Sequence, residues 1–141
     1  FGNLFKSRLI EKKYLAICEG KPRLNQSNLD LDIKNKTGKI EKTKTLFKLL
    51  NNSNNLSLIL FKPLTGKTHQ IRIVSKNLSC PIIGDNKYNN QSKFSREILK
   101  LNAHSLKFSY NNYIYEFFSL LQKDFIIFMN KNKLKYSKKE I

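Results

Sequence analysis

Cysteine pairs and long apolar runs are missing from this sequence. No stretch reaches the 18 apolar residues of a membrane-spanning helix, so we expect no membrane span. The opening residues FGNLFKSRLIEKKY place lysines where a signal peptide has its apolar segment, and the chain starts without Met, as if within a longer sequence. Its two cysteines, Cys18 and Cys80, form no C-x-x-C pair. We therefore expect reduced, buried thiols in the bacterial cytoplasm or an organelle matrix.

Acidic residues are also scarce. Ten Asp and Glu residues stand against 27 Lys and Arg residues, which gives a net charge of +17. Such an excess repels itself, and a polyanion relieves the repulsion, most commonly a nucleic acid. Two alternatives to a nucleic-acid partner stay open. Lys, Asn and Ile are all abundant, as in AT-rich genomes, and lysines such as those in KNKLKYSKK at 131–139 would serve as solvated surface residues.

The rest of the composition is that of a folded domain. Hydrophobic residues make up 40% and aromatic residues 11%, which is enough for a core and unlike a disordered tail. A length of 141 residues suits one domain. We expect residues 1–134 to form it and residues 135–141 to be a basic tail that frays.

Strand patterns dominate the chain, separated by turn signals. The predicted strands are residues 11–20, 42–50, 56–64 and the two arms around Asn111-Asn112. NNSNN should close the hairpin between the second and third of these, and Pro63 should end the latter. A weaker hairpin with Thr37-Gly38 as its turn is expected within 21–42.

Two helices are predicted among these strands. Ile71, Val74 and Leu78 have helical spacing, with Thr68 as the expected N-cap. Residues 123–134 should form a short closing helix; its buried side chains should be Phe125, Phe128 and Met129. Residues 89–100 are expected to be a loop with a helical turn. The order of elements predicts an α+β domain with a mainly antiparallel sheet.

The segment TGKTHQIRI at 65–73 resembles a phosphate-binding loop only in part. A P-loop needs a glycine five positions before Gly66, and that position holds Phe61. The segment is therefore too short to wrap a triphosphate. Backbone N–H groups of residues 66–69 at a helix start, with Lys67, could still hold one phosphate of a nucleic acid. An ordinary glycine turn into a helix accounts for the segment equally well.

Several further candidate residues fit plain structural roles. Four potential zinc ligands lack the short spacing of structural zinc sites; they are Cys18, His69, Cys80 and His104. Cys80 precedes a proline in an apolar turn, which favours packing over nucleophilic chemistry. Asp85 follows a glycine, as turn-forming aspartates do, and His104 on a strand is expected to be structural. For Tyr14, core packing and base stacking are both open.

Arg72 differs from these residues. It lies in the predicted helix among Ile71, Ile73 and Val74, and an arginine enclosed by apolar side chains needs a carboxylate or phosphate partner. Residues 43–84 contain no Asp or Glu. We therefore expect its partner to be remote or missing.

Taken together, these segments resemble a known family. TGKTHQIRIVSKNLSCPIIGDNKY is similar to the TGRTHQIR…G.PI.GD..Y signature of the RluA/RsuA-type RNA pseudouridine synthases. KKYLAICEG resembles the family's K-x-Y-x-A-x-x-x-G strand, and LNAHSLKF and SLLQKDF resemble its L-H-A-x-x-L-x-F and P-x-x-F segments. The resemblance extends to about residue 130. It identifies residues 1–134 as the carboxy-terminal portion of a pseudouridine synthase catalytic domain.

The resemblance implies isomerisation of uridine to pseudouridine in structured RNA by a monomer, without metal or other cofactor. Ribosomal RNA is the first expected partner and transfer RNA the second. In the family an Asp is the catalytic centre, a Tyr packs against the flipped uracil and an Arg pairs with the Asp. The matching positions here are Tyr14 and Arg72. The residues implied to line the cleft or its RNA-facing edge are Lys67, Thr68, His69 and Gln70.

The largest departure from the family is an absence. Its Asp lies in an R-L-D-x-x-T-S-G motif, and nothing like it occurs here; the wrong context surrounds Asp30, Asp32, Asp85 and Asp124. Smaller departures are Lys67 for Arg, Ser79 for Gly and Asn102 for His. We therefore expect this chain alone to be inactive. A non-catalytic RNA-binding module and a basic structural protein of a ribonucleoprotein remain alternatives, and an R-L-D-type motif upstream in the gene would favour the enzyme.

Overall fold

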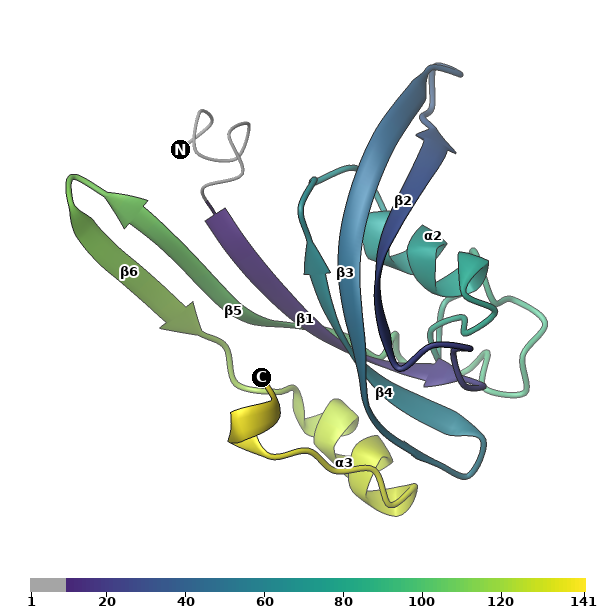
Figure 1. Ribbon diagram of the computed structural model, residues 1–141. Helices are drawn as coiled ribbons and strands as arrows, with labels where there is room; N and C mark the ends of the chain where they lie inside the picture. Colours follow the sequence, from purple (N-terminus) through teal and green to yellow (C-terminus); the bar gives the residue numbers. More distant parts are fainter. Residues whose placement is uncertain (1–9) are drawn as a thin grey trace.

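A computed structural model describes residues 10–141, so residues 1–9 of the expected domain lie outside the described part. In the described part, six antiparallel strands form a sheet in the order β2-β3-β4-β1-β5-β6, accompanied by two α-helices and a 3-10 helix (Figure 1). The elements are β1 Ile10–Glu19, β2 Gln26–Lys34, β3 Ile40–Ser53, β4 Leu56–Pro63, α2 Gln70–Asn77, β5 Leu101–Tyr110, β6 Tyr113–Phe118, α3 Lys123–Lys131 and η1 Lys138–Glu140. The predicted α+β class with a mainly antiparallel sheet is confirmed.

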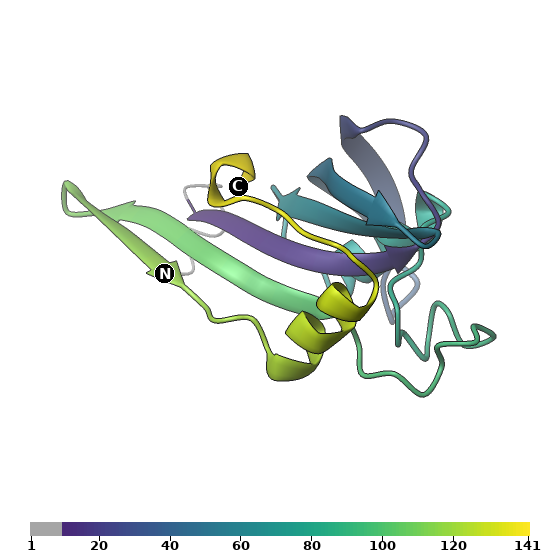
Figure 2. The same cartoon turned by 90° about the horizontal axis from the view of Figure 1, so that it is seen from below.

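Apolar side chains on both faces of the central strand explain why a helix packs on each face. Ala16 of β1 lies in a buried cluster with Ile71 and Val74 of α2. Leu15, its neighbour, lies in a second cluster with Phe125 of α3. Successive side chains of a strand point to opposite faces. The two helices therefore cover opposite faces of the sheet, with α3 on the near side in Figure 2. Each fully buried Val, Leu, Ile or Phe side chain in these clusters contributes about 1.5–3 kcal/mol to the stability of the fold.

Asparagine pairs close two of the hairpins. Asn54 and Asn55 have φ angles of 56° and 59°, and Asn111 and Asn112 have φ angles of 50° and 67°. Two consecutive residues with positive φ form the turn that best matches the twist of antiparallel strands. Both predicted hairpins are confirmed, as is the end of β4 at Pro63.

The segment 21–42 contributes more to the sheet than its polar sequence suggests. β2 pairs with β3 along its whole length, and Gly38 with φ 83° lies in the turn between them. The Thr43 hydroxyl also donates to the Leu31 carbonyl at 2.7 Å. The expected hairpin at Thr37-Gly38 is therefore confirmed, and it forms an edge of the main sheet.

Some local predictions are wrong. The N-cap of α2 is His69, not Thr68, although the helix begins at Gln70, near the predicted start. Residues 89–100 form a loop with hydrogen-bonded turns, as expected. The segment 135–141, expected as a fraying tail, ends in η1, and both Tyr136 and Ile141 pack against the cluster that contains Phe125. Among residues 10–141, no helix is both long and apolar enough to cross a membrane.

Candidate functional site

An open cleft of about 840 Å³ lies on the α2 face of the sheet. Its walls come from β1, the end of β4 and the loop after it, the first turn of α2, and the start of β5. The polar side chains that line it include Lys12, Tyr14, Lys67, His69, Gln70 and Arg72. Tyr14 and Arg72 thus face the same concave surface, as predicted. Leu99 and Leu101 add an apolar wall of the kind that a flat base could pack against.

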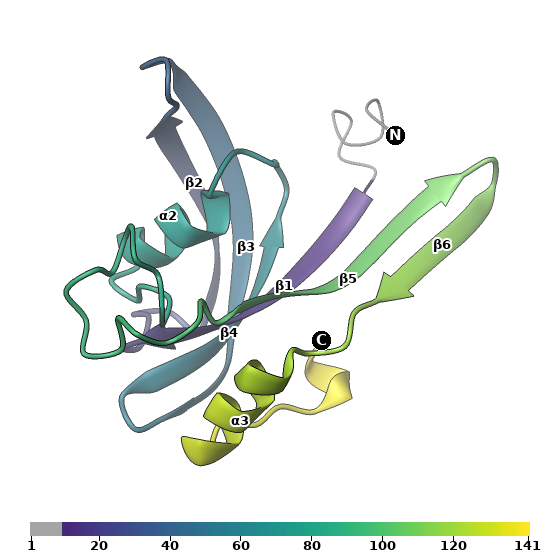
Figure 3. The same cartoon turned by 180° about the vertical axis from the view of Figure 1, so that it is seen from behind.

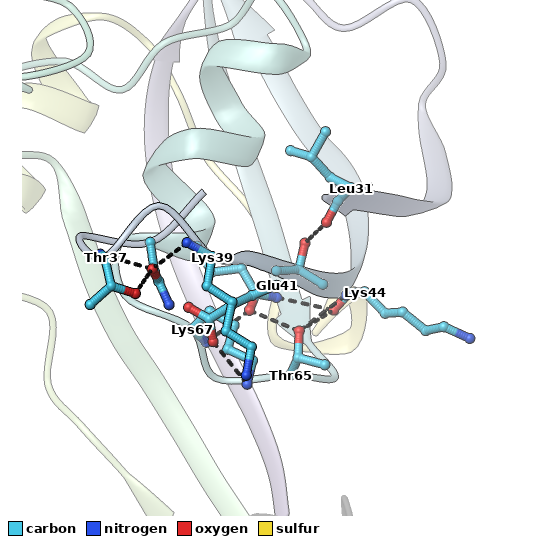
Figure 4. A network of polar contacts seen from close by, with 10 residues as sticks. Leu31, Thr37, Lys39, Glu41, Lys44, Thr65 and Lys67 are labelled. Atoms are coloured by element: carbon cyan, nitrogen blue, oxygen red, sulfur yellow. Dashed lines mark hydrogen bonds and ion pairs between the residues drawn. The ribbon is translucent and has the colours of Figure 1, made fainter. Parts of the chain in front are cut away.

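Gln70 holds the loop between β4 and α2 against β3. Its side-chain amide donates to the Lys44 carbonyl at 3.1 Å and to the Thr45 hydroxyl at 2.9 Å. Its side-chain oxygen accepts from the Thr65 hydroxyl at 2.8 Å and from the Lys67 backbone N–H at 3.0 Å. Figure 4 shows Lys44, Thr65 and Lys67 of this network together with Glu41. The Lys67 ammonium forms an ion pair with the Glu41 carboxylate, with 3.2 Å between nitrogen and oxygen. Gln70 is buried and fully engaged, so its main effect is to fix the cleft wall.

The start of α2 differs from the predicted capped helix. Thr68 is exposed and is absent from the cleft lining, while His69 occupies the N-cap position with φ 55° and makes no side-chain capping bond. The Lys67 backbone N–H already donates to Gln70. The N–H of Lys67 is therefore engaged within the chain, which removes it from the predicted set of phosphate-binding N–H groups at 66–69.

Arg72 has a partner within this chain, which corrects the expectation that its carboxylate is remote or missing. Its Nε donates to one carboxylate oxygen of Asp85 at 2.9 Å and its Nη2 to the other at 2.7 Å. The Asp85 side chain is fully buried and the Arg72 side chain is 19% exposed. This two-pronged geometry is the strongest form of ion pair for arginine. Asp85 accepts hydrogen bonds from two of the five N–H donors of the guanidinium, so the other donors can bind a further acceptor.

Asp85 also forms the turn that was predicted for it. One of its oxygens accepts from the backbone N–H groups of Lys87 and Tyr88, both at 3.0 Å. Burial raises the pKa of Asp85, but the hydrogen bonds from Arg72, Tyr88 and Lys87 lower it by more, so the pKa lies below its usual value. The same pair raises the pKa of Arg72. Both groups are therefore charged at neutral pH.

Gly84 lets the chain turn so that the carboxylate of Asp85 reaches Arg72. Its φ is 81°, and a Cβ at this position would lie 2.6 Å from the carbonyl carbon and oxygen of Ile98. Left-handed backbone and lack of space both require glycine.

We expect Gly84→Ala to lower the free energy of unfolding by about 3 kcal/mol or more, because strain and overpacking add. Gly38→Ala is the matched control: its φ is 83°, but nothing lies within 4 Å of the added Cβ. It should cost only about 1–2 kcal/mol. Urea unfolding of the two variants checks this, and equal losses would contradict the close approach at Gly84.

Tyr88 connects Arg72 with the cleft edge. The Arg72 guanidinium carbon lies 5.3 Å from the centre of the Tyr88 ring, and the Tyr88 hydroxyl lies 3.2 Å from His69 Nδ1. Burial, Arg72 and Lys87 lower the pKa of His69, so its ring is neutral at pH 7. His69, Arg72, Asp85 and Tyr88 therefore form one connected polar group.

Lys12 and Tyr88 were not singled out from the sequence. Lys12 lines the cleft, and its ammonium lies 3.2 Å from where a Cβ on Gly66 would stand. Burial lowers the pKa of Lys12. Its position two residues before Tyr14 on a strand places both on one face, so strand periodicity could have found it. Tyr88 ends the quoted signature, yet only the structure shows what it contacts.

The remaining candidates lie apart from this chemistry. Cys18 and Cys80 are free and buried, as predicted. Burial raises the pKa of Cys80 to about 11 and that of Cys18 further, which keeps both thiols protonated. His104 packs edge-on against Phe118, and within the described part its buried Nδ1 has no hydrogen-bond partner. No group of three His, Cys, Asp or Glu residues gathers as a metal site within residues 10–141.

The chain is similar to proteins that modify RNA. Residues 1–77 match the model of a family described as RNA pseudouridylate synthase. A ribosomal large subunit pseudouridine synthase C of Rickettsia bellii is 43% identical over 98 residues, which cover 61% of this chain and 33% of that protein. A Haemophilus influenzae protein described as an uncharacterized RNA pseudouridine synthase is 39% identical over 124 residues, covering 81% of this chain and 54% of that protein.

A solved structure has the same fold. The human RNA Pseudouridylate Synthase Domain Containing 4 superposes with a TM-score of 0.86 at 22% identity, covering 97% of this chain and 67% of that one. The chain thus spans about a third of the length of the Rickettsia relative and about half of the Haemophilus relative.

Proposed function

The chain belongs to the RNA pseudouridylate synthase family, and we propose that it supplies the base-binding half of an active site that isomerises uridine to pseudouridine in RNA. The reaction breaks the bond between N1 of uracil and C1′ of ribose, turns the base and joins C5 to C1′; the proton on C5 is lost and N1 gains a proton, so that product and substrate are isomers. No metal or redox cofactor is needed to balance these steps. A base must leave the stack before such chemistry can reach it.

One observation carries this proposal: Tyr14 and Arg72 line the same cleft, from β1 and α2. A half-buried tyrosine beside Leu99 and Leu101 offers a flat surface for a flipped uracil. Arg72 is held rigid by Asp85, and its remaining donors could orient a second carboxylate or the ribose oxygens. Lys12 and Lys67 would contact phosphates at the rim.

The catalytic aspartate of the family has no counterpart within these 141 residues. Asp85 does not substitute for it, because its side chain is fully buried and both oxygens bond to Arg72. We propose that the nucleophile comes from polypeptide outside this sequence. The name of the Rickettsia relative favours ribosomal RNA as substrate, acted on by a monomer in the bacterial cytoplasm or an organelle matrix.

A chimera tests the function. Residues 1–141 replace the matching region of the Haemophilus relative, and release of tritium from C5-labelled uridine in ribosomal and transfer RNA is measured. We expect product from the chimera and none from residues 1–141 alone, since removing a core catalytic group costs many orders of magnitude in rate. Turnover by residues 1–141 alone would place the nucleophile inside this chain. A folded chimera that binds RNA without turnover would favour the non-catalytic RNA-binding module.

RNA binding by the chain should fall steeply with salt, because Lys and Arg release counterions from the phosphates they neutralise. Lys67→Ala should weaken binding and reduce the slope of log K against log salt by about 1. Lys131→Ala on α3, on the opposite face of the sheet, is the matched control and should leave the slope unchanged. Filter binding of an RNA stem-loop at several salt concentrations measures both. An RNA affinity that does not change with salt concentration would indicate that the excess of lysines reflects an AT-rich genome and not a nucleic-acid partner.

A further inference from the structure

The imidazole of His69 lines the cleft with one of its two nitrogens already bonded. Nδ1 lies 3.2 Å from the Tyr88 hydroxyl, and the two rings meet edge to face with their centres 5.9 Å apart. Figure 3 shows the loop between α2 and β5, to which Tyr88 belongs, lying beside α2. Within residues 10–141 this is the one hydrogen bond of the His69 ring. Nε2 is therefore the nitrogen that can serve a ligand in the cleft.

Tyr88 determines which nitrogen of the His69 ring carries the proton. Burial and the charges of Arg72 and Lys87 lower the pKa of His69, so the ring is neutral and has one N–H and one bare nitrogen. A phenol O–H is a stronger donor than the N–H of a neutral imidazole, so the favoured bond runs from the Tyr88 hydroxyl to Nδ1. The ring proton then stays on Nε2. His69 thereby presents a hydrogen-bond donor to the cleft.

Tyr88 is itself held in place. Its backbone N–H donates to the Asp85 carboxylate at 3.0 Å. The Arg72 guanidinium and the Lys87 ammonium lie 5.3 and 5.4 Å from the centre of its ring, within the range of cation–π attraction. A tyrosine fixed in this way fixes the imidazole that it bonds. A donor that is already oriented binds a ligand without a further loss of side-chain entropy.

His69 also has a backbone conformation that its side chain does not stabilise. Its φ is 55° and its ψ 24°, in the left-handed region, and the side chain makes no capping hydrogen bond to α2. This conformation costs energy for most residues, less for asparagine and nothing for glycine. At Asn54 and Asn111 the chain uses asparagine for such backbone. A histidine in this conformation on a cleft wall therefore indicates a function of the side chain.

The surroundings of His69 suit a phosphate oxygen as the acceptor. Residues 66–68, which precede it in the chain, are exposed at the rim. Lys12 lines the same cleft and adds positive charge, whereas Leu99 and Leu101 form the apolar wall suited to a base. Most hydrogen bonds from proteins to nucleic acids go to phosphate and sugar oxygens.

We propose that His69 donates a hydrogen bond from Nε2 to a phosphate oxygen of the nucleotide that enters the cleft, and that Tyr88 positions it for this contact. The inference rests on the proposed function, because it takes RNA as the occupant of the cleft. A neutral donor removes no charge from the phosphate and releases no counterion. Unlike the contact of Lys67, this one should therefore not depend on salt.

Nitrogen-15 NMR of residues 1–141 tests the role of Tyr88 without RNA. The chain has two histidines, so a His104→Gln variant assigns the ring signals of His69. We expect the ring proton of the wild type on Nε2. Tyr88→Phe keeps the aromatic ring but loses the hydroxyl, so both tautomers should be populated. A wild-type ring protonated on Nδ1, or a tautomer that Tyr88→Phe leaves unchanged, would overturn the positioning by Tyr88.

Two amide substitutions separate the phosphate contact from a structural role. The amide nitrogen of glutamine reaches about as far as Nε2, whereas that of asparagine does not. We expect His69→Asn to weaken RNA stem-loop binding by about tenfold or more, and His69→Gln by less than about threefold. The slope of log K against log salt should stay unchanged in both. The Tm of His69→Asn should equal or exceed that of the wild type, because asparagine tolerates left-handed backbone. A loss of binding only in the variant with the lower Tm would show a structural role.

Modified RNA identifies the acceptor. In stem-loops with one loop phosphate at a time replaced by a methylphosphonate, one replacement should weaken binding by the wild type and not weaken binding by His69→Asn further. Additive losses at every linkage would overturn the contact, as would coupling only to a 2′-deoxyribose or no RNA binding by the wild type at low salt. Tritium release by the chimera is measured in parallel. Coupling without turnover would count against the proposed catalysis alone, and turnover without coupling against the His69 contact alone.

Discussion

Arg72→Ala in the chimera should reduce kcat for pseudouridine formation by about 10²–10³, the loss seen when one fixed electrostatic group is removed from an active site. Arg72 and Tyr14 line the same cleft, and the Asp85 carboxylate holds the Arg72 guanidinium through hydrogen bonds of 2.9 and 2.7 Å. Affinity for RNA should change little, because the charge of Arg72 is already balanced by Asp85, whereas the RNA is held by lysine contacts to its phosphates. Tritium release under single-turnover conditions, with RNA affinity measured in parallel, separates the two effects.

A second variant separates catalysis from folding. Arg72→Ala leaves the buried Asp85 carboxylate unpaired, which by itself destabilises the domain. The double variant Arg72→Ala, Asp85→Asn removes that charge while keeping an acceptor for the turn. We expect it to fold better than Arg72→Ala and to stay inactive. Recovery of activity in the double variant would show that Arg72 has only a structural role.

Asp85→Ala should lower the free energy of unfolding of residues 1–141 by about 3–5 kcal/mol, the usual cost of breaking a buried ion pair from one side. The side chain of Asp85 is fully buried, and its loss also frees the Lys87 and Tyr88 N–H groups. Urea unfolding at pH 7 measures the effect. Asp32→Ala on the exposed face of β2 is the control and should change stability by less than about 0.5 kcal/mol.

Asp85→Asn refines this test, because an amide oxygen can still accept from the turn while the charge is lost. Its cost should lie between those of the control and of Asp85→Ala. A cost for Asp85→Ala no larger than that of Asp32→Ala would contradict the ion pair.

Stability should also depend on pH through Asp85. Its pKa in the folded chain lies below the usual value, so its contribution is complete above the unfolded-state pKa of about 3.9 and is lost as pH falls through the folded pKa. We expect the free energy of unfolding to fall below about pH 4, and less steeply in Asp85→Asn. Identical acid profiles for the two proteins would show that another group titrates.

The hairpins were predictable because local chemistry determines them. Asn111-Asn112 tolerates the positive φ that a tight turn needs, and Pro63 cannot donate into a continuing ladder. β2 was harder to predict, because its alternation of Leu29 and Leu31 with polar residues is short and it is held by pairing with β3. The N-cap of α2 was misplaced by one residue because the Gln70 side chain holds the preceding loop against β3, a contact that the sequence does not reveal.

The site was predictable only in part. Tyr14 and Arg72 were assigned by resemblance, and the structure places both on one cleft. The partner of Arg72 was missed although Asp85 lies 13 residues away, because the chain must turn back at Gly84 before the two meet. Lys12 was overlooked among so many lysines, since net charge does not show which of them face inward.

A crystal structure of the chimera bound to a ribosomal RNA stem-loop is the most direct test of the site. The target uridine should be flipped out of the helix, with its uracil stacked on the Tyr14 ring against Leu99 and Leu101 and the Arg72 fork facing the ribose. A uracil bound away from this cleft, with Tyr14 still packed against the sheet and Arg72 contacting only Asp85, would contradict the proposed active site.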